Sequence, residues 1–130
     1  MKKSAMIIFF AGIIVFSLSG CATTGAGDTV NKTDAGKMMK TTLGPSKLYE
    51  HCMEIGAGQK MDYTFSSKDP LNFYIHYHDE GSRYEKDKRD EVSALEGTFS
   101  ADRKQIYCLT WTNPQPRSVD ITYSFVIQKE

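Results

Sequence analysis

The sequence predicts an all-β protein, an antiparallel β-sandwich of about seven to eight strands that follows a signal helix and a flexible tether. Two observations predict this fold class. From Ser46 onward, aromatic and β-branched residues come in short runs that glycine, proline, asparagine and aspartate interrupt. No segment of this region keeps a helical apolar period for three turns.

Residues 1–20 predict an export signal. Lys2 and Lys3 give a positive start, and a nearly unbroken apolar stretch of 14 residues (5–18) follows. This stretch is shorter than the ~20 residues that cross a bilayer as a helix, and its length is typical of the apolar part of a signal peptide. A plain secretory signal and an uncleaved anchor are the alternatives.

The end of the leader resembles the lipobox of bacterial lipoproteins, with Leu18-Ser19-Gly20 directly before Cys21. The resemblance implies cleavage before Cys21, a thioether-linked diacylglycerol on that cysteine and a further acyl chain such as palmitate on the new amino terminus. Several acyl chains give stable membrane anchoring. Ala22 in place of aspartate resembles the pattern sorted to the outer membrane, so we expect an exported, lipid-anchored envelope protein that faces the periplasm in a Gram-negative cell.

The remaining cysteines, Cys52 and Cys108, form an even pair once Cys21 carries lipid. In an oxidising compartment such a pair favours one disulfide, and two free buried thiols are the alternative. The leader holds two lysines and no acidic residue, so the mature chain has 14 basic against 16 acidic residues, a net charge of −2. A binder of nucleic acid needs a basic face, so this balance argues against that class.

The elements after the leader are predicted in order from composition and alternation. Residues 21–45 are small, polar and rich in glycine and threonine, which predicts a tether, with one short helical turn at 37–43 ended by Gly44 and Pro45. Residues 46–130 are expected to form the sandwich domain. Its strands are expected near 47–56, 60–67, 71–79, 83–87, 92–100, 104–112 and 118–128, with turns at 56–58, 68–70, 80–82 and 113–116. In the strand at 71–79, one face holds Leu71, Phe73, Ile75 and Tyr77 and the other holds Asn72, Tyr74, His76 and His78, which predicts that the first set faces the core. The charged run 79–91 predicts a solvated loop or an edge strand.

The order of motifs in residues 52–125 is similar to the GOLD (Golgi dynamics) domain family. The motifs are Cys52 with Glu54, then 58–65 (GQKMDYTF), 71–75 (LNFYI), 79–81 (DEG), 96–100 (EGTFS), 107–113 (YCLTWTN) and 119–125 (VDITYSF). The resemblance implies a jelly-roll-like β-sandwich, paired cysteines and binding rather than catalysis. The chain departs from the cargo-receptor branch because it lacks a carboxy-terminal coiled coil and membrane span, so a cargo-receptor role is not expected.

His76 and His78 are candidate metal ligands. Residues i and i+2 of a strand share a face, so both imidazoles point the same way and suit Cu or Zn. Tyr74, Asp79, Glu80 and His51 are conceivable third ligands. The alternative is that both histidines are polar residues on the solvent side of a strand. Trp111 alternates with Tyr107 and Leu109, which favours core packing over an aromatic platform for a ligand.

The sequence favours a binding or structural role over catalysis. No serine lies on a nucleophile elbow, and the predicted disulfide removes the thiols. We therefore expect a non-enzymatic lipoprotein of the bacterial envelope, held on the membrane by its lipid and meeting an envelope protein. The alternative is a periplasm-facing Cu- or Zn-binding lipoprotein that uses His76 and His78.

Overall fold

The computed structural model describes residues 36–129. The predicted signal peptide, the lipid-carrying Cys21 and the tether up to residue 35 lie outside the described residues. Within 36–129, no helix has the length and apolar character needed to cross a membrane.

Six antiparallel strands are present within residues 36–129, which confirms the predicted all-β class. Five of them follow the order β1-β6-β3-β5-β2, and β4 pairs with β3. The strands are β1 (Met39–Leu43), β2 (Leu48–Ile55), β3 (Lys60–Asp79), β4 (Ser82–Ser100), β5 (Gln105–Thr112) and β6 (Val119–Ile127).

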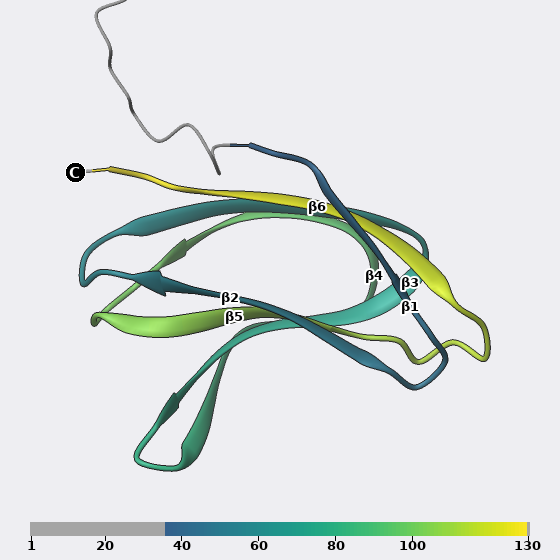
Figure 1. The fold of residues 1–130 in the computed structure, drawn as a ribbon, viewed down its shortest axis with the longest axis horizontal. Coiled ribbons are helices and arrows are strands. Elements are labelled where there is room, and N and C mark those ends of the chain that lie inside the picture. Colours follow the sequence, from purple (N-terminus) through teal and green to yellow (C-terminus); the bar gives the residue numbers. More distant parts are fainter. Residues whose placement is uncertain (1–35, 130) are drawn as a thin grey trace, which may run out of the picture. The chain divides into compact units, whose positions relative to one another are not determined.

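The long strands β3 and β4 belong to both layers of the sandwich (Figure 1). The first half of β3 pairs with β6, and its second half, from Asn72 to Tyr77, pairs with β5. Its register with β4 shifts between Ser66 and Leu71. The first layer therefore holds β1, β6, the start of β3 and the end of β4, whereas the second layer holds β2, β5, the end of β3 and the start of β4.

The strand count is lower than predicted because two pairs of predicted strands are continuous. Segments 60–67 and 71–79 form β3, and segments 83–87 and 92–100 form β4. The turn expected at 68–70 is an irregularity inside β3, where Pro70 interrupts the ladder without ending the strand. The charged run 79–91 lies in the β3–β4 hairpin. Among the described strands β4 pairs only with β3, so the edge-strand interpretation is confirmed.

The domain begins earlier than residue 46. Residues 39–43 were predicted as part of the tether, with a helical turn, but they form β1 and pair with β6 from Met39 opposite Tyr123 to Leu43 opposite Val119. The physical reason is burial, because Leu43 is 2% exposed and joins the core. The side-chain amide of Asn113 donates hydrogen bonds to the carbonyl of Leu43, at 3.0 Å, and to that of the next residue.

The core between the layers is aromatic. Trp111 of β5 is 1% exposed, and its ring centroid lies 4.8 Å from Tyr123 of β6 and 5.5 Å from Phe73 of β3. Trp111 is therefore a core residue, as its alternation predicts. The predicted inward face of the second half of β3 is also confirmed, because every member is at most 5% exposed: Leu71, Phe73, Ile75 and Tyr77.

Candidate functional site

The predicted disulfide is present on the outward face of the second layer. Cys52 of β2 and Cys108 of β5 stand directly opposite each other, with 4.0 Å between their Cα atoms and 1.96 Å between their sulfur atoms. Cys52 is exposed and Cys108 is buried. A disulfide of this kind is typical of proteins exported to an oxidising compartment.

His76 lies beside this disulfide but is almost fully covered. It projects from β3 to the outward face, yet only 1% of it is exposed. Its Nδ1 lies 3.0 Å from Oγ1 of Thr110, and its Nε2 lies 3.6 Å from Oε1 of Glu50. Burial lowers the pKa of His76 below its ordinary 6.5, although the Glu50 carboxylate opposes that shift. The imidazole is therefore neutral at pH 7.

His78 shares this face with His76, as the strand periodicity predicts. Their ring centroids are 5.1 Å apart, and His78 is exposed. Tyr74 lies on the same face, where its hydroxyl accepts a hydrogen bond of 3.4 Å from Arg83. Both histidines thus lie on the outward face of the second layer, but only His78 is exposed to solvent. The neighbouring Arg83 guanidinium disfavours a positively charged ligand there.

Two of the other suggested third ligands are engaged elsewhere. Asp79 pairs with Arg103 at 3.2 Å. His51 lies on the inward face of β2, where its Nδ1 is 2.8 Å from the Tyr123 hydroxyl. The carboxylate that does approach His76 is that of Glu50, which is not among the predicted ligands. Its only sequence signal is that it shares a strand face with Cys52, two residues on.

Three potential metal donors converge at one place in the part of the chain that the structure describes. One donor atom each from Glu50, His76 and Cys108 lie within 4.8 Å of one another. The sulfur of Cys108 is bonded to that of Cys52, so it does not offer a thiolate in this state. His78 is not a member of this group.

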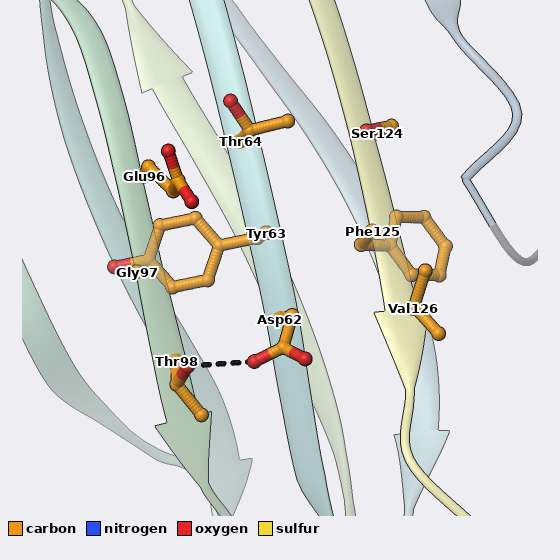
Figure 2. A pocket seen from close by; sticks show the side chains of 9 residues that line it. All are labelled: Asp62, Tyr63, Thr64, Glu96, Gly97, Thr98, Ser124, Phe125 and Val126. Carbon is orange, nitrogen blue, oxygen red and sulfur yellow. Dashed lines mark hydrogen bonds between the residues drawn. The ribbon is translucent and has the colours of Figure 1, made fainter.

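A groove of about 700 Å³ lies over the first layer (Figure 2). It opens to solvent and runs across three neighbouring strands. Hydroxyl and carboxylate groups share its lining with a few apolar side chains: Asp62, Tyr63 and Thr64 of β3, Glu96, Gly97 and Thr98 of β4, and Ser124, Phe125 and Val126 of β6. A groove with both apolar and polar groups can bind the surface or an extended segment of another protein.

Asp62 is held in place at one end of this groove. Its carboxylate accepts hydrogen bonds from Thr98, at 2.6 Å, and from the side-chain amide of Gln128, at 2.7 Å. The hydrogen bond from Thr98 is the main reason why the pKa of Asp62 lies below its ordinary value, so the groove carries a negative charge at neutral pH.

The floor of the groove depends on a glycine. Gly97 stands opposite Tyr63 in the β3–β4 ladder, and the tyrosine ring lies over it (Figure 2). A Cβ atom on residue 97 would be 2.6 Å from the Tyr63 hydroxyl oxygen and 2.8 Å from Cζ. Only glycine admits the ring in this position.

The fold and the cross-strand disulfide define a small antiparallel β-sandwich protein. A comparison with protein-family models and one with curated proteins each found no match. Among solved structures, the fold is similar to PliG of Aeromonas hydrophila, a periplasmic inhibitor of g-type lysozyme. The TM-score is 0.53 at 11% identity, over 72% of this chain and 86% of that chain.

A second similar structure is the pre-peptidase C-terminal domain of a collagenase from Bacillus anthracis. Here the TM-score is 0.55 at 11% identity, over 70% of this chain and 89% of that chain. At such identities the two likenesses show a shared fold and nothing about the ligand.

Proposed function

We propose that this chain is a lipid-anchored, non-enzymatic binding protein of the bacterial cell envelope, which presents the groove of the first layer to an envelope protein. The observation that carries the proposal is the groove itself. It is open, crosses three strands and has fixed polar groups such as Asp62 and Thr98. An open groove that combines apolar and polar groups suits an extended or macromolecular partner better than a small substrate that must be shielded from water.

The envelope location is supported by two independent features. The lipobox-like end of the leader predicts lipid on Cys21, and the Cys52–Cys108 disulfide is typical of an oxidising compartment. Since β1 begins at Met39, the predicted tether is shorter than the sequence alone indicates. Its composition predicts a coil that would span about 20–25 Å, which keeps the sandwich close to the lipid surface.

A photocrosslinking experiment in cells tests the binding surface. A photoreactive residue replaces Thr64, which is exposed in the groove, and a control replaces Ile106, which is 56% exposed on the second layer. We expect a discrete crosslinked product from position 64 alone. The variant Glu96→Lys should abolish it, whereas Glu54→Lys, a charge reversal at an exposed residue of the second layer, should not. Equal labelling from both positions would contradict the proposal.

A purified binding assay complements the crosslinking. PliG has this fold and inhibits g-type lysozyme, so such a lysozyme is the first defined protein to titrate. The specific result is binding that Glu96→Lys weakens and Glu54→Lys leaves unchanged.

The second candidate function is metal binding through His76 and His78. It is favoured by the 5.1 Å between their ring centroids and by the Glu50 carboxylate 3.6 Å from Nε2 of His76. Titration of the disulfide-bonded protein with Cu(II) or Zn(II) tests it. A dissociation constant below about 10 µM that rises on His76→Ala and on His78→Ala would support this function, and weaker binding would remove it.

A further inference from the structure

Three residues form a straight row across the second layer. Cys52 of β2 is directly opposite Cys108 of β5, and Cys108 is directly opposite His76 of β3. Residues that stand opposite each other in a sheet have their side chains on the same face, about 5 Å apart. This cysteine–histidine row therefore places two sulfur atoms and one imidazole side by side on one surface.

Glu50 completes the set from a neighbouring position. Its Oε1 lies 3.6 Å from Nε2 of His76, and its side chain is 37% exposed, so it can adjust. One donor atom each from Glu50, His76 and Cys108 already lie within 4.8 Å of one another. In tetrahedral zinc sites the metal–ligand distances of 2.0–2.3 Å put neighbouring ligand atoms about 3.6 Å apart. These three donor atoms need to move by only about 1 Å. Sγ of Cys52 is 1.96 Å from that of Cys108 and must move away from it by about 1.6 Å once the S–S bond is broken.

A hydrogen bond at Nδ1 orients the His76 imidazole so that Nε2 can bind a metal ion. The Thr110 hydroxyl donates to the carbonyl of Cys108, at 3.5 Å, so its oxygen is left to accept a hydrogen bond from Nδ1–H of His76 at 3.0 Å. The lone pair of His76 is then on Nε2, the atom that faces Glu50. Metal-binding histidines are commonly fixed in this way through the nitrogen that does not bind the metal.

We propose that reduction of the Cys52–Cys108 disulfide converts this row into a Zn(II) site. Its four ligands are the thiolates of Cys52 and Cys108, Nε2 of His76 and a carboxylate oxygen of Glu50. Two thiolates select Zn(II) over harder divalent cations. This site differs from the His76/His78 pair because His78 is not one of its ligands. It can form only when the disulfide is reduced, since the disulfide-bonded sulfur atoms are not thiolates.

A dithiol reductant supplies the two electrons. One thiolate of the reductant attacks Sγ of Cys52, the more exposed cysteine, and the electron pair of the S–S bond leaves on Sγ of Cys108. The second thiolate of the reductant then attacks the mixed disulfide, so Cys52 leaves as a thiolate and the reductant ends as a disulfide. Zn(II) binds the two protein thiolates without a further change of oxidation state.

Cobalt titration tests the proposal on the full chain purified in detergent. The protein is reduced with dithiothreitol, freed of reductant under argon and titrated with Co(II). We expect one equivalent to bind with a thiolate-to-cobalt charge-transfer band, a dissociation constant below about 1 µM, and displacement by Zn(II). Protein that keeps its disulfide should show no such band.

Matched variants assign the ligands. His76→Ala should weaken binding by at least about tenfold, whereas His78→Ala should leave it unchanged, which separates this site from the His76/His78 pair. Glu50→Gln should weaken binding, and Glu54→Gln, on the same strand face, should not. Cys108→Ser should weaken the charge-transfer band because one thiolate remains, and the double substitution Cys52→Ser with Cys108→Ser should remove it.

Circular dichroism of the reduced protein accompanies each titration. A folded, reduced protein without the band, or a band that His76→Ala leaves intact, would overturn the proposal. If the reduced chain is unfolded without metal, Zn(II) should restore the β-sheet spectrum, and failure to do so would also overturn it.

Discussion

Removal of the disulfide gives the clearest stability prediction. The cross-link joins residues 56 apart in sequence. On the chain-entropy model, a loop of this length restricts the unfolded chain enough to stabilise the folded state by about 4 kcal/mol. The double substitution Cys52→Ser with Cys108→Ser should therefore lower the free energy of unfolding by about that amount, a large share of the total for a domain of this size. The β2–β5 ladder should survive, because it extends on both sides of the cysteines, from Leu48 to Ile55.

Urea denaturation followed by tryptophan fluorescence measures this change. Trp111 is the single tryptophan of the chain and is 1% exposed, so its emission reports the core directly. With a slope near 2 kcal/mol/M, the midpoint should fall by about 2 M. Wild-type protein in reductant and chelator is the control and should match the double variant. A loss below about 1 kcal/mol, with the fold intact, would refute the loop-closure reasoning.

Three further predictions concern single residues. Gly97→Ala should destabilise the domain by about 1–3 kcal/mol because the new Cβ atom meets the Tyr63 ring. In a double-mutant cycle, Tyr63→Leu should recover part of that loss, and additive effects would argue against the clash. Asn113→Ala should cost about 2–4 kcal/mol in thermal unfolding, since this buried side chain bonds three backbone carbonyls and one amide, and a neutral effect would be inconsistent with that role. Burial lowers the folded-state pKa of His76, so the neutral imidazole stabilises the fold fully above about pH 6.5. This contribution to the free energy of unfolding is lost as the pH falls toward the folded-state pKa. His76→Gln should remove this part of the pH dependence of the melting temperature, and an unchanged profile would count against it.

The sequence was sufficient to predict which face of a strand a residue occupies, because that depends only on alternation along the strand itself. Alternation along 71–79 placed Phe73 and Ile75 in the core and His76 on the opposite face, as observed. It also predicted most strands, but it divided β3 and β4 because Pro70 and the charges of 79–91 are typical of turns. Pairing across the sheet overrode these local preferences. β1 was not predicted for the same reason. Its residues follow a small, polar, tether-like segment, and only the pairing with β6 and the burial of Leu43 make them part of the sheet.

The candidate site depends on contacts that no local pattern specifies. Two cysteines in an exported chain predict a bond, and that prediction is confirmed. That His76 stands beside the bond follows from β5 lying between β2 and β3, which is a property of strand order. Glu50 is brought to His76 by the same order, so it could not be chosen among the acidic residues in advance. The groove likewise requires β6 to lie beside β3.

The central claim, a lipid-anchored envelope protein with a disulfide-linked sandwich, is tested most directly by mass spectrometry of the chain isolated from its own membranes. We predict an amino-terminal peptide that begins at Cys21 and carries a diacylglycerol and acyl mass, together with a linked peptide pair that contains Cys52 and Cys108. A chain that retains residues 1–20, or one that begins at an unmodified Cys21, would contradict the account.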